Sequence, residues 1–109
     1  MQVRMEKNKL TVKNKDGVWY IDFQKIIYLE FMDKKISLYT DDAQVVFSGT
    51  MGHVQDLLPP YFIRCHRGFI VNEHKIKNLN FGKNYLTVSS GKVIPISRSY
   101  KKVFREKIG

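Results

Sequence analysis

The stretch of sequence that decides the fold is Tyr61-Phe62-Ile63-Arg64-Cys65-His66-Arg67-Gly68-Phe69-Ile70-Val71-Asn72. It is apolar at both ends and basic and polar in the middle. The aromatic and β-branched residues at its ends are typical of β-strands that pack on a core. The two arginines and the histidine between them need water or an anion around their charge. The stretch therefore predicts a β-scaffold that holds positive side chains outward.

The length and composition of the chain predict one small β-rich domain. The chain has 109 residues, of which 43% are apolar and 13% are aromatic, enough for a single core. Its one cysteine cannot form an internal disulfide, so we expect a reducing compartment, the cytoplasm. No segment approaches the roughly 20 apolar residues of a membrane span, and the N-terminus does not resemble a secretion signal.

The net charge of +9 is carried by the second half of the chain. Residues 1–60 contain eight basic and eight acidic side chains, whereas residues 61–109 contain eleven basic and two acidic ones. Such an excess favours a polyanionic partner, because contacts with phosphates release counterions. A surface that is basic only for solubility is the alternative explanation.

The hydrophobic pattern predicts many short strands. Apolar or alternating runs bounded by turn residues predict strands at 10–12, 18–21, 26–31, 36–40, 43–47, 62–63, 69–71, 76–81, 85–88 and 93–96. This spacing is typical of a sandwich or a small multi-sheet β-fold rather than of a βαβ fold.

Two helices and a linker complete the predicted organisation. Thr50 is placed to cap a helix over residues 51–58, and Ser97 is placed to cap a terminal helix over residues 98–107. Residues 1–8 are polar and lack periodicity, so we expect a linker or a disordered segment there.

No pattern in the sequence supports catalysis or metal binding. The three histidines and the cysteine lack metal-ligand spacing, and there is no glycine-rich phosphate loop. Cys65 and His66 are adjacent, so on a strand their side chains point to opposite faces and make a poor nucleophile–base pair. We therefore expect no enzyme activity, no cofactor, no metal and no small-molecule substrate.

Cys65 has two interpretations. As a small buried hydrophobic residue it needs no function. Beside Arg64, His66 and Arg67, its thiolate would be stabilised, and the residue could then respond to oxidants.

Three groups of basic residues could face an anion. They are the segment 64–67, the pair Lys34 and Lys35 in a turn, and the terminal helix. On that helix, the basic residues recur at spacings that place them on one face, and the apolar residues are available to bury the other. The basic residues are Arg98, Lys101, Lys102 and Arg105, and the apolar residues are Tyr100, Val103 and Phe104.

At three places the sequence resembles LytTR DNA-binding domains. Phe62–Asn72, followed by His74-Lys75-Ile76, is similar to the family's F-x-R-x-H-R-S-[YF]-I-V-N segment. Ile26–Glu30 is similar to its I-x-Y-[IL]-E strand, and Ile94–Lys102 is similar to its L-P-[IV]-S-R-R-Y ending. The blocks occur in the family's order and together cover about residues 9–107. Gly68 departs from the pattern, which usually has serine there.

The resemblance implies an elongated, mainly β, ten-stranded fold of three sheets with one or two short helices, in a domain over residues 9–109. It implies sequence-specific binding of double-stranded DNA by loops that enter successive major grooves, in the output domain of a bacterial transcriptional response regulator. The expected partners are direct-repeat promoter DNA, a second copy of the chain as a homodimer on that DNA, and a receiver domain or other regulatory region in the full-length protein.

The resemblance and the chemistry of basic side chains together give the candidate contacts. An arginine can bond guanine O6 and N7 with two donors, whereas a lysine holds a phosphate as a point charge. We expect contacts with bases from Arg67, Arg98, His66 and Lys35. We expect contacts with phosphates from Lys34, Arg64, Ser97, Tyr100, Lys101, Lys102 and Arg105. Arg64 has an alternative role, as a partly buried group that orients the loop.

Two other functions stay open from the residues alone. A small β-domain that binds RNA or single-stranded DNA would expose aromatic side chains on a sheet face. The aromatic residues Tyr28, Phe31, Phe81 and Tyr85 instead have patterns typical of a core. A protein-interaction or dimerisation module would use the basic face to bind an acidic partner.

Overall fold

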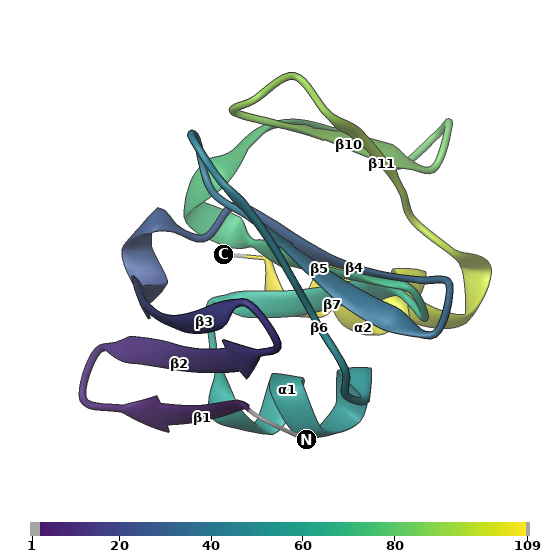
Figure 1. Cartoon of the computed structure of the whole chain (residues 1–109). Helices are drawn as coiled ribbons and strands as arrows, with labels where there is room; N and C mark the ends of the chain where they lie inside the picture. The colour runs from purple at the N-terminus through teal and green to yellow at the C-terminus, as the bar shows by residue number, and fades with distance from the viewer. Residues whose placement is uncertain (1–2, 109) are drawn as a thin grey trace.

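The computed structural model describes residues 3–108, which form three β-sheets, two α-helices and two short 3-10 turns (Figure 1). In chain order, the elements are β1 (Val3–Glu6), β2 (Lys9–Asn14), β3 (Gly17–Asp22), η1 (Phe23–Lys25), β4 (Tyr28–Met32), β5 (Lys35–Tyr39), β6 (Gln44–Phe47), α1 (Met51–Leu57), β7 (Phe62–His66), β8 (Phe69–Asn72), η2 (Glu73–Lys75), β9 (Ile76–Asn80), β10 (Tyr85–Val88), β11 (Val93–Pro95) and α2 (Arg98–Lys107). The domain is elongated, with extents of 41 × 23 × 22 Å. The expected mainly β, three-sheet fold is confirmed.

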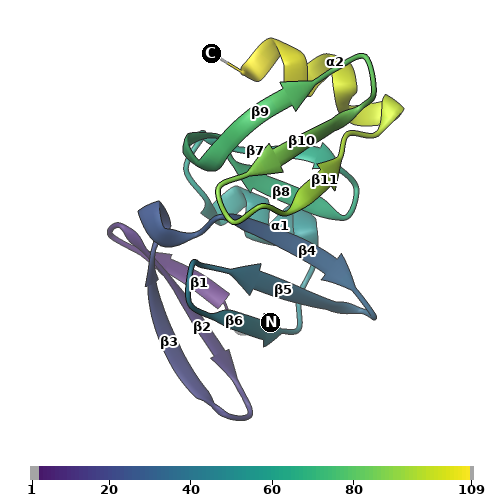
Figure 2. The same cartoon turned by 90° about the horizontal axis from the view of Figure 1, so that it is seen from above.

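A five-stranded antiparallel sheet with the strand order β6-β5-β4-β8-β7 lies between two smaller sheets (Figure 2). The sheet β1-β2-β3 covers one side of it and the sheet β11-β10-β9 covers the other. The pairing of β4 with β8 brings the family-like block Ile26–Glu30 beside the stretch 61–72 at the centre of the molecule. Pro95 lies on the edge strand β11, as its missing N–H predicts.

Strand β8 of the central sheet is buried on both faces, which explains why Phe69, Ile70 and Val71 are all apolar. In β8, Ile70 belongs to a core shared with β1–β3 and α1. Its neighbours Phe69 and Val71 belong to a second core, shared with β9–β11 and α2. Because neighbouring residues on a strand point to opposite faces, a strand between two cores has no polar face.

The N-terminal segment differs from the prediction. Val3–Glu6 forms β1, which pairs with β2, and the Val3 side chain is buried opposite Val12. The described residues therefore contain eleven strands where ten were expected, and residues 3–6 are not a linker. Only one of the four side chains in β1 is buried, so the segment carries no alternation that would predict a strand. Residues 1 and 2 lie outside the described residues.

Both predicted helices are present, with differences in detail. The Thr50 hydroxyl accepts a hydrogen bond from the His53 backbone N–H over 3.3 Å, which confirms the predicted cap of α1. Ser97 occupies the cap position of α2, but its side chain makes no cap bond. Val103, predicted on the buried face of α2, is 48% exposed. In the part of the chain described here, neither helix has the length and hydropathy to cross a membrane.

Candidate nucleic-acid interface

The β7–β8 hairpin presents Arg67 at its tip. The pairing of the two strands shifts register between Arg64 and His66, which leaves Cys65 as an extra residue, a β-bulge. Simple alternation along the strand would place Cys65 and Arg67 on the same face. A bulge bends the strand and relaxes this constraint. Cys65 is accordingly buried while Arg67, just past the end of β7, is exposed.

Arg64 and His66 brace this turn from within. The Arg64 guanidinium donates to the carbonyl of Arg67 over 2.6 Å and to that of His66 over 3.4 Å. It also lies over the Tyr100 ring, 5.3 Å from the ring centre. His66 Nδ1 accepts a hydrogen bond from the Gly68 N–H over 3.0 Å, so in the neutral imidazole Nε2 carries the proton. These bonds support the alternative role of Arg64, which is to orient the loop.

A second turn lies beside the first. β4 and β5 are joined by Asp33 and Lys34, whose φ angles are 55° and 65°. Two successive residues with positive φ form the tight hairpin turn whose twist matches that of the flanking strands. The Phe31 N–H donates to the Gly68 carbonyl over 2.9 Å, which ties β4 to the β7–β8 turn. Lys34 and Arg67 therefore occupy neighbouring turns at one end of the central sheet.

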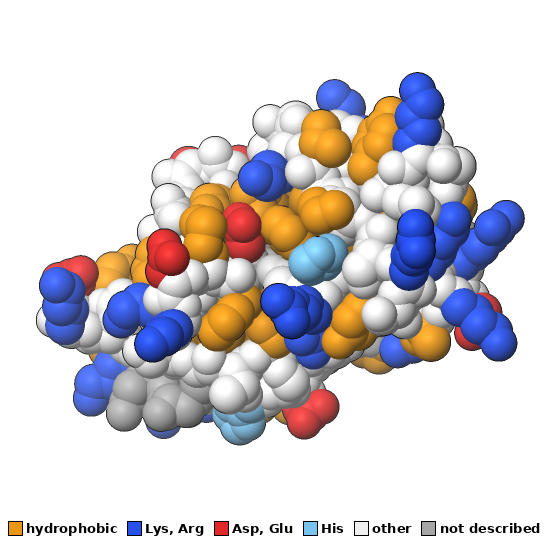
Figure 3. Space-filling view, turned by 90° about the vertical axis from the view of Figure 1, so that its right-hand side faces the viewer, with side chains coloured by type: hydrophobic (Ala, Val, Ile, Leu, Met, Phe, Trp, Pro, Cys, Tyr) orange, Lys and Arg blue, Asp and Glu red, His pale blue; other side chains and the backbone are white. Residues whose placement is uncertain are grey.

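The two turns share a groove of about 790 Å³, which we call the central groove. Residues 49–52, at the start of α1, form part of its wall. Phe31, predicted in the core, also lines it and is 42% exposed. Figure 3 shows this side of the molecule, where Lys and Arg side chains gather around a histidine and exposed hydrophobic side chains. The basic and imidazole side chains in the groove are Lys34, Arg64, Arg67 and His66.

The start of α2 lies against the same hairpin. The Ser97 N–H donates to the Cys65 carbonyl over 2.9 Å, and α2 packs along β7. Arg98, the first residue of the helix, is exposed. Two family-like blocks that are far apart in the chain are thus joined by a backbone hydrogen bond, which places Arg98 near the hairpin that carries Arg67.

The predicted basic face of α2 is divided between two roles. Lys101 donates to the Phe81 carbonyl over 2.8 Å, and the Arg105 guanidinium lies 4.9 Å from the centre of the Phe81 ring. Both side chains therefore fasten α2 to the segment after β9, whereas Lys102 is exposed. The Ser97 hydroxyl oxygen is buried without a hydrogen-bond partner among residues 3–108. In this conformation it cannot reach a phosphate.

The remaining predicted contacts lie at the margins of the central groove. Lys35 is exposed at the start of β5 and lines a neighbouring groove rather than the central one. Tyr100 is half-buried, with the Arg64 guanidinium over its ring. Sequence reasoning missed Phe31 and Thr50 as groove residues, because an apolar strand residue and a helix cap carry no signal of their exposure to a ligand.

Cys65 belongs to the second core and is 0% exposed. Burial raises the pKa of its thiol to about 12, so the reactive thiolate is disfavoured near neutral pH. The effect of burial on the thiol outweighs the effect of the neighbouring basic residues. It supports the interpretation of Cys65 as a small buried hydrophobic residue. Among residues 3–108, no three His, Cys, Asp or Glu side chains gather where they could hold a metal ion.

The raised pKa of Cys65 predicts a loss of stability in alkaline solution. The unfolded chain releases the thiol proton near pH 9, whereas the folded chain holds it until about pH 12. The contribution of the thiol is therefore complete below pH 9 and falls by about 1.4 kcal/mol per pH unit above it. Urea denaturation should show a steeper fall for the wild type than for Cys65→Ala. Parallel curves for the two proteins would count against this prediction.

Gly68 has room for the serine that usually occupies its position in the family it resembles. A Cβ added there would lie 3.5 Å from His66 Nδ1 and 3.6 Å from the Phe31 carbonyl oxygen, which are ordinary contact distances. Gly68 is not among the residues with positive φ. We expect Gly68→Ser to change the free energy of unfolding by less than about 0.5 kcal/mol in urea denaturation. A loss of several kcal/mol would show that the turn requires glycine.

Comparison with known proteins agrees with this geometry. The family model described as LytTr DNA-binding domain matches residues 16–109. This chain belongs to the LytTR DNA-binding domain family. The LytTR fold seen here is also similar to a solved structure, described as the LytTr DNA-binding domain of a response regulator from Bacillus cereus. The two are 34% identical with a TM-score of 0.84, and the match covers 95% of this chain and 99% of that one.

The curated relatives of this LytTR domain are longer proteins. The sensory transduction protein LytT of Enterococcus faecalis is 30% identical, over 92% of this chain and 43% of that protein. LytT of Bacillus subtilis is 32% identical, over 91% of this chain and 43% of that protein. The transcriptional regulatory protein YpdB of Escherichia coli is 28% identical, over 95% of this chain and 45% of that protein. The chain thus spans less than half the length of these relatives.

Proposed function

We propose that this LytTR domain binds double-stranded DNA sequence-specifically, as the output part of a longer bacterial transcriptional response regulator. The observation that carries the proposal is the placement of Arg67 and Arg98. Both are exposed, both belong to family-like blocks, and the Ser97–Cys65 backbone bond holds their segments together. The domain acts by binding rather than by catalysis, and it acts in the cytoplasm.

Arg67 and Arg98 are the proposed readers of base edges. A guanidinium presents two donors that match O6 and N7 of guanine in the major groove. His66 adds an Nε2 donor beside Arg67. Lys35 adds a base contact from the protein groove next to the central groove. Phe31 supplies apolar surface for the methyl group of thymine.

The other basic side chains are proposed to contact phosphates. Lys34 and Lys102 are exposed and can do so directly. Arg64 uses two of its nitrogens to hold the turn, and a guanidinium has five N–H donors, so others are left for a phosphate. Proposed contacts from residues that also hold α2 in place are Tyr100, Lys101 and Arg105.

The dimensions of the domain support binding along one side of the duplex. Its length of 41 Å exceeds one turn of B-DNA, about 34–36 Å, so loops at different points along it can enter successive major grooves. We propose that the sites are direct repeats occupied by two copies. A receiver domain or another regulatory region accounts, in this proposal, for the additional length of the relatives.

Selection of binding sites from random duplex DNA at about 0.15 M salt tests the proposal. We expect a motif to be enriched and to contain guanines at the positions read by arginine. Single-stranded DNA and RNA of the same sequence should compete poorly with the selected duplex. Preference for single strands would favour a stacking role for exposed aromatics such as Phe31. Failure of any motif to enrich would favour a protein-interaction module.

A further inference from the structure

A second basic surface lies at the tip of the β2–β3 hairpin. Lys13 and Lys15 are exposed there, and both line a groove of about 700 Å³, which we call the hairpin groove. Lys35 lies on the same groove, together with Trp19 and the edge strand β6. Neither Lys13 nor Lys15 belongs to a family-like block, so no motif assigns them a role.

The tip of this hairpin is fastened to the central sheet. Asn14 donates through Nδ2 to the Val46 carbonyl of β6 over 2.7 Å. Its Oδ1 accepts a hydrogen bond from the Asp16 N–H over 2.8 Å. One side chain thus shapes the turn and attaches it to the edge of the five-stranded sheet. The backbone that carries the two lysines is therefore ordered before any ligand binds, which lowers the entropic cost of binding.

The hairpin groove adjoins the central groove. Lys34 and Lys35 are consecutive residues, and Lys34 lines the central groove while Lys35 lines the hairpin groove. On the opposite wall, Ser48 lines the hairpin groove, and residues 49–50 line the central groove. All three residues also line a smaller hollow. The two grooves therefore lie next to each other between Arg67 and the β2–β3 turn, and we call them together the track.

The figures show how this track lies on the molecule. In Figure 2, the β2–β3 turn and α2 are at opposite ends, and the β4–β5 turn lies between them. In Figure 3, Lys and Arg side chains lie along the whole length of the face shown, and Asp and Glu side chains lie among them on its left-hand side. The basic surface therefore extends well beyond the segment from Arg67 to α2.

The charge of the hairpin groove fits a phosphodiester backbone. Its walls carry three lysines, Lys13, Lys15 and Lys35, against one acidic residue, Asp16. A lysine ammonium is a flexible point charge that binds phosphate oxygens without reading base sequence. The β2–β3 side of this groove, with Lys13 and Lys15, is therefore suited to fix the position of a duplex and not to select its sequence.

We propose that the β2–β3 hairpin is an additional phosphate-binding element, in which Lys13 and Lys15 contact the DNA backbone beyond the bases read by Arg67 and Arg98. This inference rests on the proposed function, because it requires a duplex bound along the track. The 41 Å length of the domain corresponds to about 12 base pairs at roughly 3.4 Å each. The hairpin contacts one flank of the site only, the flank away from α2.

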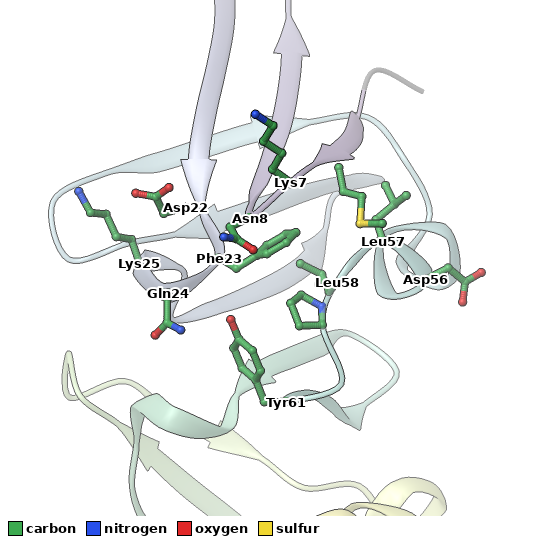
Figure 4. A pocket seen from close by; sticks show the side chains of 12 residues that line it. Lys7, Asn8, Asp22, Phe23, Gln24, Lys25, Asp56, Leu57, Leu58 and Tyr61 are labelled. Carbon is green, nitrogen blue, oxygen red and sulfur yellow. The ribbon is translucent and has the colours of Figure 1, made fainter.

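The test compares two double variants that remove the same charge. Lys13→Gln/Lys15→Gln removes the proposed contacts. The matched control is Lys7→Gln/Lys25→Gln, whose lysines line a different groove, of about 710 Å³, together with Asp22 and Asp56 (Figure 4). Thermal melting of both variants shows first that they are folded.

The readout is affinity for the selected duplex at several salt concentrations. Each lost phosphate contact lowers the slope of log affinity against log salt by about 0.9, so Lys13→Gln/Lys15→Gln should lower it by about 1.8. Affinity near 0.15 M salt should fall on the order of tenfold, with the ratio of cognate to scrambled binding unchanged. The control should stay within about twofold of the wild type. Extending one flank of a short duplex by about five base pairs should help the wild type but not the variant.

Equal weakening by the two variants would overturn the inference, because the effect would then be one of net charge. A fall in the ratio of cognate to scrambled binding would also overturn it, since the hairpin would then be reading bases. Failure of the proposed function itself looks different, because the wild type would then bind cognate and scrambled duplexes equally well.

Discussion

Arg98→Ala is expected to leave the domain folded and to cut its preference for the selected duplex over a scrambled one by about 1–3 kcal/mol, roughly 5–150-fold. The side chain is exposed at the first residue of α2, so its removal uncovers no core. Arg67→Ala, at the tip of the β7–β8 hairpin, is expected to have an effect of the same size at a different base position. Competition binding with duplexes changed one base pair at a time measures both effects.

Two further variants separate base reading from simple charge. Arg98→Lys keeps the positive charge but loses the two parallel donors, so it should lose discrimination nearly as fully as Arg98→Ala. Arg4→Ala removes an exposed arginine from β1, outside the candidate contacts, and should leave discrimination unchanged. The assignment of Arg98 as a base contact is wrong if Arg98→Lys keeps the wild-type preference for the selected duplex over the scrambled one. It is also wrong if Arg98→Ala weakens cognate and scrambled binding equally, since Arg98 would then be a phosphate contact.

The strands could be predicted because the physics that makes them is local. β8 lies between two cores, so it is an uninterrupted apolar run, and the Thr50 cap stands directly before the helix it begins. β1 could not be predicted, because its stability comes from pairing with β2 and not from its own pattern. Val103 was assigned to the buried face from helical spacing alone, but only Phe104 of α2 is fully buried.

The candidate site was predicted in its residues but not in its internal bonds. The resemblance to a family selected Arg67 and Arg98, but no local pattern states that the Ser97 N–H binds the Cys65 carbonyl. The β-bulge at Cys65 depends on pairing between strands and cannot be read from alternation along one of them. For the same reason the sequence left the role of Arg64 open, and its bonds to the turn became visible only in the fold.

Phe104→Ala is expected to cost about 3–5 kcal/mol of the free energy of unfolding, measured by urea denaturation. α2 has ten residues, and Phe104 is the one whose side chain is buried, at 0% exposure in the second core. Its ring lies 6.3 Å from that of Phe81, whose carbonyl accepts the Lys101 hydrogen bond. A helix this short is marginal in water by itself, so it depends on packing against β7.

Val103→Ala is the matched control, because it places alanine in the same turn of the same helix at a side chain that is 48% exposed. Its cost should stay within about 0.5 kcal/mol. If α2 detaches while the sheets stay folded, Phe104→Ala should also abolish discrimination at the base position read by Arg98. Discrimination at the base position read by Arg67 should remain. Rapid amide exchange confined to α2 would identify this local unfolding. A cost below about 1 kcal/mol, with both kinds of discrimination intact, would mean that Phe104 does not hold the helix in place.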